Sequence, residues 1–155
     1  MTRSLLAALF SVVLVGPALA DPGHGHGGQR AYGVPGDPAR TSRVVEVVMS
    51  DADGRMRFEP DRVEVRRGDQ IRFVLRNTGV LDHELVLATL EDNLKHAEVM
   101  RKHPDMEHDD PNARRLMPGA SGEILWKFTK AGTFDFSCLI PGHREAGMTG
   151  TIIVK

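Results

Sequence analysis

Apolar and polar residues alternate through much of the chain, in short runs separated by turn residues. This alternation turns one face of an extended segment toward a core and the other toward water, which is typical of strands. Clusters of Asp, Asn and Gly between the runs supply turn chemistry. The clearest runs are residues 44–49, 63–65, 71–76, 83–88, 124–128, 133–138 and 149–154. The pattern predicts about seven to eight short strands.

One stretch, residues 89–119, departs from this pattern. Thr89 can cap a helix that runs to about His103, where Pro104 ends it. Three residues at helical spacing are expected to face the body of the protein: Leu90, Leu94 and Ala97. Together the strands and this insertion predict an all-β fold, a two-sheet Greek-key β-sandwich with one helical insertion.

The chain opens with the pattern of a secretory signal peptide. Residues 1–20 carry Arg3 near the start, then an apolar run and an Ala-Leu-Ala ending. The apolar run is too short to span a membrane as a helix. We therefore expect cleavage after Ala20, export, and no membrane anchor afterwards.

Residues 21–42 are rich in Gly and Pro and predict a flexible tail. His24 and His26 could bind a metal weakly in such a segment, although a solvated tail explains them as well. The expected organisation is therefore a signal peptide, this tail, and one domain over residues 43–155 that contains the helical insertion.

Charge and cysteine content narrow the range of possible functions. Lys and Arg number 20 against 21 Asp and Glu, a formal net charge of −1, which favours neither nucleic acid nor a membrane surface. Cys138 is the only cysteine, so it cannot form an internal disulfide. In an exported protein an exposed thiol is open to oxidation. Metal binding as a thiolate would explain this cysteine, and so would simple burial.

The stretch that begins at Cys138 carries the candidate chemistry. His143 follows Cys138 by five residues, and Met148 follows His143 by five. Thiolate, imidazole and thioether together suit copper, and two His with one Cys and a weak Met form an electron-transfer copper centre. The best candidate for the second histidine is His83, at the start of a predicted strand. The sequence therefore predicts one mononuclear copper site.

The same residues also allow other interpretations. A lone Cys is most often a buried apolar residue, a lone Met fills a core, and Pro-Gly-His can be an ordinary turn. A structural zinc protein or a metal-free adhesion-like sandwich would then result, although zinc rarely recruits Met. A fragment of a multicopper oxidase is also conceivable, but one Cys supports only one such centre.

The insertion suggests an alternative function. Its Met and His residues could capture copper(I) at a second site and pass an electron to the first, which would make the protein a copper(I)-oxidising or copper-scavenging detoxification protein. Such residues on a helix edge are more often packing or solvated surface. The candidates are His96, Met100, His103, Met106 and His108.

Over about residues 44–155 the chain resembles the cupredoxin family of mononuclear type 1 copper proteins. The resemblance is carried by His83-Glu84-Leu85, Ala131-Gly132-Thr133-Phe134, Cys138, Pro141-Gly142-His143 and Gly147-Met148-Thr149-Gly150. The chain is most similar to small periplasmic members associated with bacterial copper tolerance. The resemblance implies His83, Cys138 and His143 as equatorial copper ligands and Met148 as the axial one. Glu84 stands where many electron carriers of the family have an Asn that helps to fasten the Cys loop.

This resemblance implies a periplasmic copper-binding protein that serves one-electron transfer, copper homeostasis and tolerance, or both, rather than an enzyme. Copper would be its cofactor. Apolar neighbours surround His143 in the sequence, so we expect this ligand to lie nearest solvent, where a redox partner protein could dock. Cuprous oxidase activity is the enzymatic alternative.

Overall fold

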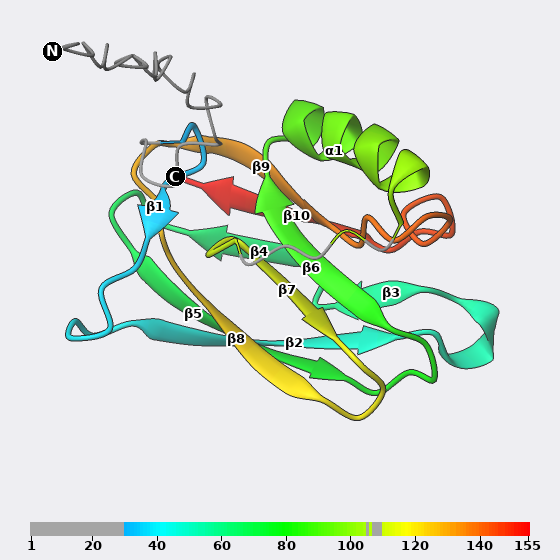
Figure 1. The fold of residues 1–155 in the computed structure, drawn as a ribbon. Coiled ribbons are helices and arrows are strands. Elements are labelled where there is room, and N and C mark those ends of the chain that lie inside the picture. The colour runs from blue at the N-terminus through cyan, green and yellow to red at the C-terminus, as the bar shows by residue number, and fades with distance from the viewer. Residues whose placement is uncertain (1–29, 105, 107–109) are drawn as a thin grey trace, which may run out of the picture.

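Two five-stranded sheets form the body of the protein (Figure 1). The computed structural model describes residues 30–104, 106 and 110–155. The first sheet has the strand order β1-β8-β5-β2-β3 and the second has β4-β10-β9-β6-β7. The predicted β-sandwich is therefore confirmed. The predicted signal peptide, His24, His26 and His108 lie outside the described residues.

The chain passes between the sheets several times, and most neighbouring strands are antiparallel. Among the strands that the structure describes, only the pairs β2–β5 and β4–β10 are parallel. The first sheet contains β1 (Val34–Pro35), β2 (Arg43–Ser50), β3 (Arg57–Glu59), β5 (Gln70–Asn77) and β8 (Ser121–Lys127). The second contains β4 (Arg62–Val65), β6 (His83–Ala88), β7 (Ala113–Leu116), β9 (Gly132–Ser137) and β10 (Thr149–Val154). This is more strands than predicted, because the short strands β1, β3 and β7 lie outside the seven clearest runs of the sequence.

The core lies between the sheets and follows the alternation of the sequence. On β5, the predicted apolar face of Ile71, Phe73 and Leu75 is buried, with exposed fractions of 0–2%. On β8, Ile124 and Trp126 are buried in the same way. Removing apolar surface from water stabilises the fold by about 25 cal/mol per Å². The two rigid sheets therefore provide the frame on which the site is built.

Part of the predicted flexible tail is ordered. Tyr32 is buried and stacks on Trp126 with ring centroids 5.5 Å apart. The indole N–H of Trp126 donates a hydrogen bond to the backbone carbonyl of Tyr32 at 2.9 Å. Strand β1 then pairs with β8. Tyr32 and β1, which belong to the predicted tail of residues 21–42, therefore pack on the first sheet. Composition misses this packing, because one aromatic ring and a few backbone hydrogen bonds are enough to hold the segment.

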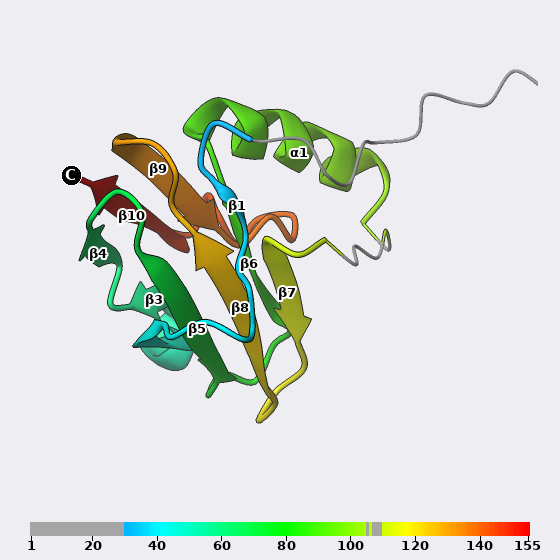
Figure 2. The same ribbon diagram turned by 90° about the vertical axis from the view of Figure 1, so that its left-hand side faces the viewer.

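Helix α1 (Leu90–Lys102) packs on β6 and β9 of the second sheet (Figure 2). As predicted, Thr89 caps it, with the side chain accepting a hydrogen bond from the Asp92 backbone N–H at 3.1 Å. The predicted buried face is only partly right, however: Ala97 is buried, but Leu90 and Leu94 are 52% and 49% exposed. The buried residues are Asn93, Ala97 and Met100.

The physical reason for this rotation is the side chain of Asn93. Its Nδ2 donates to the Val86 carbonyl at 3.0 Å and to the Asp135 carboxylate at 2.6 Å. These bonds direct the Asn93 face of the helix toward the sheet and leave the leucines in solvent. No helix among the described residues is long and apolar enough to cross a membrane.

The predicted insertion, residues 89–119, also contributes a strand to the sandwich. Strand β7 pairs with β6 in register His83↔Leu116 through Val86↔Ala113. Helix α1, in contrast, stands outside the sheets (Figure 1). This strand escapes the sequence pattern because Arg114 and Arg115 separate its two buried residues, Ala113 and Leu116.

Candidate metal centre

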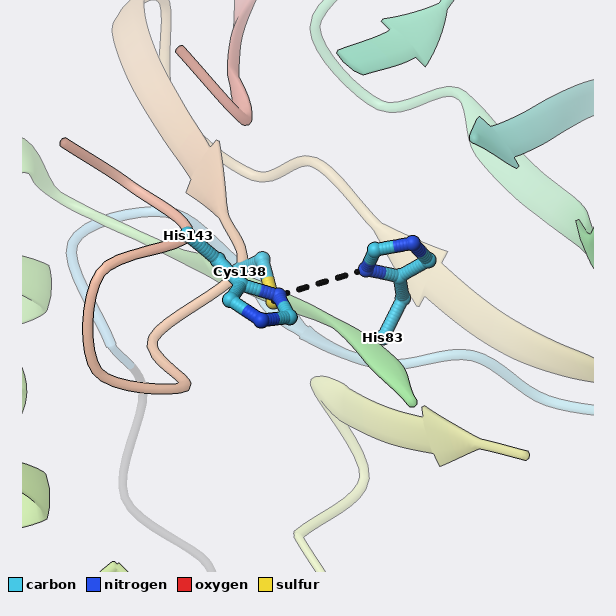
Figure 3. A group of neighbouring side chains, drawn as sticks. All are labelled: His83, Cys138 and His143. Carbon is cyan, nitrogen blue, oxygen red and sulfur yellow. Dashed lines mark hydrogen bonds between the residues drawn. The ribbon is translucent and has the colours of Figure 1, made fainter. Parts of the chain in front are cut away.

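Three predicted ligands meet at one end of the sandwich (Figure 3). His83 begins β6, Cys138 directly follows β9, and His143 lies in the loop between β9 and β10. Nδ1 of His143 lies 3.3 Å from Sγ of Cys138 and 3.3 Å from Nδ1 of His83. All three residues are buried, and their donor atoms lie within 4.8 Å of one another. Nδ1 of His143 therefore faces both Sγ of Cys138 and Nδ1 of His83.

This arrangement fits a copper ion. Bonds from a first-row metal to nitrogen and sulfur are about 2.0 and 2.3 Å long, so three such ligands in a plane lie roughly 3.5–4 Å apart. The donor set is soft and nitrogen-rich, as copper prefers. It is the only group of His, Cys, Asp or Glu in the described part of the chain that is close enough for a shared metal.

Met148 is held at the end of the same loop. Its backbone N–H donates to the His143 carbonyl at 3.0 Å, and its carbonyl accepts from the Cys138 N–H at 3.1 Å. These bonds close the loop and keep Met148 near the cysteine. His143 is 9% exposed, whereas His83, Cys138 and Met148 are 0% exposed. His143 is thus nearest to solvent, as expected.

Burial controls the protonation of the site. Desolvation raises the pKa of the Cys138 thiol to about 12, against the opposing effect of the Glu84 N–H that points at Sγ from 3.5 Å. Burial lowers the pKa of His83, although Asp51 partly opposes this, and burial followed by the nearness of His83 lowers the pKa of His143. At neutral pH both imidazoles are therefore neutral and the metal-free thiol keeps its proton.

Glu84 fastens the cysteine loop. Its carboxylate accepts a hydrogen bond from the Leu139 backbone N–H at 2.9 Å, and its own N–H points at Sγ of Cys138. Burial raises the pKa of this carboxyl above its usual value, with the Leu139 hydrogen bond acting in the opposite direction. A longer acidic side chain thus makes the contact that the resemblance assigns to Asn.

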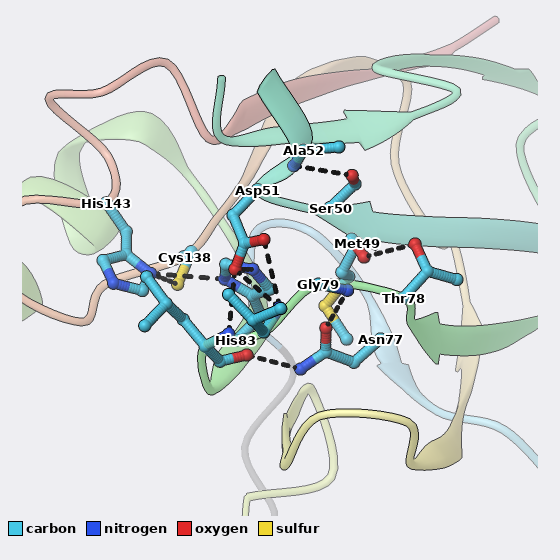
Figure 4. A network of polar contacts seen from close by, with 12 residues as sticks. Met49, Ser50, Asp51, Ala52, Asn77, Thr78, Gly79, His83, Cys138 and His143 are labelled. Atoms are coloured by element: carbon cyan, nitrogen blue, oxygen red, sulfur yellow. Dashed lines mark hydrogen bonds and ion pairs between the residues drawn. The ribbon is translucent and has the colours of Figure 1, made fainter. Parts of the chain in front are cut away.

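A second carboxylate, Asp51, lies against the far side of His83 (Figure 4). Its Oδ2 is 3.3 Å from Nε2 of His83. It also accepts hydrogen bonds from the backbone N–H groups of Val80, at 3.1 and 3.0 Å, and Leu81, at 2.8 Å. Burial alone would raise the pKa of Asp51, but these donors and His83 outweigh it, so the pKa lies below its usual value.

The sequence gives no signal for Asp51, which stands in a Ser-Asp-Ala-Asp-Gly run that is read as an ordinary turn. It comes directly after β2 of the first sheet, whereas the ligands come from the second sheet. Only the packing of the two sheets brings it to His83. The site therefore joins both layers of the sandwich.

A polar network anchors the ligand loop from the other side. Arg144 donates to the Asp135 carboxylate at 3.0 and 3.3 Å and also contacts the Ser137 hydroxyl. Asp135 in turn accepts from Asn93 of α1. The side chains of Arg144 and Asp135 are only 14% and 11% exposed. The helix and the loop that carries His143 are thus linked through one partly buried ion pair.

The residues of the predicted second site lie in different environments. Met100 is fully buried in a small core cluster with Val86, Ala97, Ala113 and Leu139. His96 is half-buried, whereas His103 and Met106 are exposed. The structure therefore places one member of the predicted set in a packed core and two on the surface.

The sandwich and the His–Cys–His cluster together define a class of protein. The family model described as copper-binding proteins of the plastocyanin/azurin family matches residues 45–155. The chain belongs to this family, and copper is the metal that the family binds. The resemblance predicted from the sequence is confirmed.

Individual relatives narrow the assignment within this family. A copper-resistant cuproprotein, CopI, of Rubrivivax gelatinosus is 51% identical and covers 97% of this chain and 93% of its own length. The CopI of Pseudomonas aeruginosa is 35% identical and covers 99% of this chain and 98% of its own. Among solved structures, auracyanin B superimposes with a TM-score of 0.62 over 82% of this chain and 96% of its own, at 24% identity. That likeness supports the fold alone.

Proposed function

We propose that His83, Cys138 and His143 would hold one copper ion and that Met148 would be a fourth, weaker ligand. The observation that carries this proposal is the buried convergence of two Nδ1 atoms and one Sγ atom. Bound there, copper can accept and release one electron, and a trigonal site suits both of its oxidation states.

The protein contributes rigidity and dryness to this site. His83 is fixed on a strand, Glu84 fastens Cys138 and its loop, and backbone hydrogen bonds close the loop at Met148. Such anchoring holds ligands in one geometry before metal arrives. His143 would then connect the metal to the surface, and a redox partner would dock over the exposed Pro141 and Ala146 beside it.

We further propose that the protein acts in copper tolerance in the periplasm. The support is the identity of 51%, over nearly the full length of both chains, to a protein named for copper resistance. Residues 1–20 would serve as the cleaved signal peptide, so the exported protein would begin at Asp21. The mass of the protein isolated from a periplasmic fraction tests this cleavage site.

The function is tested by growth of a copper-sensitive bacterial host that expresses this chain. We expect the wild-type protein to raise the copper concentration at which growth stops, and Cys138→Ser to lose this effect at equal periplasmic abundance. Met117→Ala, which changes a 69% exposed thioether that belongs to neither candidate copper site, is the matched control and should protect like the wild type. Equal protection by Cys138→Ser would contradict the proposal.

A further inference from the structure

The ring of His83 is held on both sides. Nδ1 faces the other ligands, and Nε2 faces the carboxylate of Asp51 at 3.3 Å (Figure 4). Nε2 is fully buried and has no well-directed hydrogen bond within the described part of the chain. Asp51 is thus the charged group that this buried nitrogen meets. The side chain of Asp51 is itself only 7% exposed.

The carboxylate is fixed in place by its surroundings. Val80 and Leu81 donate backbone hydrogen bonds to it from the loop that leads into His83. Gly79 leaves the space that it occupies, because a Cβ there would lie 2.7–2.9 Å from the carboxylate atoms. Asn77 holds the same loop, accepting from Gly79 N–H at 2.9 Å and donating to the Leu81 carbonyl at 2.8 Å. The neighbouring backbone therefore fixes the position of the Asp51 carboxylate.

We propose that Asp51 is a positioning residue that tunes the copper centre through His83, an inference that rests on the proposed function. Its carboxylate faces the Nε2–H tautomer of His83, which leaves Nδ1 unprotonated for the metal. A carboxylate behind a metal-bound imidazole also raises the basicity of that ligand. Its negative charge stabilises copper(II) more than copper(I), because the attraction grows with the charge of the ion. The site is thereby biased toward the oxidised metal.

The decisive comparison is Asp51→Asn against Asp82→Asn. Each removes one negative charge beside His83, but Asp82 is 38% exposed and is paired with Arg115 at 3.2 Å. For Asp51→Asn we expect the ratio of copper(II) to copper(I) affinity to fall about tenfold or more. A tenfold fall raises the one-electron reduction potential by about 59 mV. Asp82→Asn should change the ratio much less, because solvent and salt screen its charge.

A third variant tests the position of the Asp51 carboxylate while its charge is kept. Gly79→Ala keeps every charge but pushes the carboxylate away from its place, since the added Cβ would overlap it. We expect its potential to rise in the same direction as that of Asp51→Asn. The proposal is overturned if Asp51→Asn and Asp82→Asn shift the potential equally, or if Gly79→Ala leaves it unchanged.

The metal-free protein gives an independent readout. Nitrogen NMR of the His83 ring should show the Nε2–H tautomer in the wild type, and Gly79→Ala should weaken that preference. An Nδ1–H tautomer in the wild type would overturn the role of Asp51 even if copper binds normally. Conversely, the expected tautomer in a protein that binds no copper through Cys138 would contradict the proposed function and leave the Asp51–His83 contact standing.

Discussion

Cys138 is so deeply buried that its thiol keeps its proton until a metal replaces it. The pKa of about 12 means that almost no thiolate exists at neutral pH in the metal-free protein. A buried thiol of this kind resists oxidation. The same burial becomes an advantage once the metal is bound, because the site is dry and its ligands have few alternative positions.

Copper binding should therefore release a proton. Between pH 7 and 9 we expect the apparent copper(II) affinity to rise about tenfold per pH unit, because one thiol proton is displaced for each ion bound. The histidines add no proton in this window, since the pKa values of both His83 and His143 are lowered. Competition with a chelator of known pH dependence measures the slope. A slope near zero would show that Cys138 does not bind as a thiolate.

The same lowered histidine pKa values predict loss of apo-protein stability in acid. Below the ordinary histidine pKa of 6.5, the unfolded chain takes up protons that the folded chain refuses. The free energy of unfolding should therefore fall as the pH drops below about 6.5. Denaturant titrations of the metal-free protein from pH 7.5 down to pH 5 measure this. A matched fall in a His83→Gln, His143→Gln variant would contradict the assignment to these two residues.

Residue types and spacing reveal the ligands but not their supports. Cys138, His143 and Met148 are predictable because soft donors recur at a fixed interval on one short segment. Asp51 is not predictable, because a carboxylate in a turn carries no information about which strand will pack beside it. Its role depends on the meeting of two sheets, which appears only in three dimensions.

At the scale of elements, helix α1 and the ligand loop act as one unit. The Asp135 carboxylate on β9 accepts hydrogen bonds from Arg144 of the loop and from Asn93 of the helix. Because this carboxylate has little contact with water, removing its cation leaves a charge that solvent does not fully compensate. The helix therefore serves as a brace for the loop that carries His143.

Arg144→Ala should lower the free energy of unfolding by about 1–3 kcal/mol, between the costs for an exposed and a fully buried ion pair, because this pair is partly buried. Denaturant titration of the metal-free protein measures this loss. The control is Arg115→Ala, which breaks an exposed pair with Asp82 and should cost under about 1 kcal/mol. Equal losses in the two variants would show that the Asp135 network does not brace the loop.

Met100 gives the test for the predicted second copper site. It packs in a core cluster between α1 and the sheet and is 0% exposed. Met100→Ala should therefore lower the free energy of unfolding by about 3 kcal/mol and leave copper stoichiometry unchanged. Met106→Ala, 36% exposed, should change neither. A lost equivalent of copper(I) in Met100→Ala, with stability unchanged, would restore the detoxification alternative.

The helix also shows what sequence patterns do not predict. Thr89 and Pro104 predict where the helix begins and ends. The sequence does not predict which face of the helix is buried. Two overlapping stripes fit the helical period, and hydrophobicity favours the one that contains Leu90 and Leu94. The polar anchor Asn93 decides for the other, because its hydrogen bonds to Val86 and Asp135 are lost if the helix turns.

At the scale of the whole molecule, the two sheets supply different parts of the centre. The second sheet presents all four proposed ligands at one end, and the first sheet brings Asp51 to the back of His83. Residues 30–35 lie against β8, where Tyr32 covers Trp126. Strand alternation predicts this sandwich well, whereas the short strands β1 and β7 have too few apolar residues to stand out in the sequence.

The central claim is that one copper ion binds through Cys138. The most direct measurement is the visible absorption spectrum of the purified protein as copper(II) is added under air. The account predicts intense thiolate-to-copper bands that saturate at one equivalent and are absent from Cys138→Ser. Folded wild-type protein that shows no such band and keeps a free thiol would contradict it.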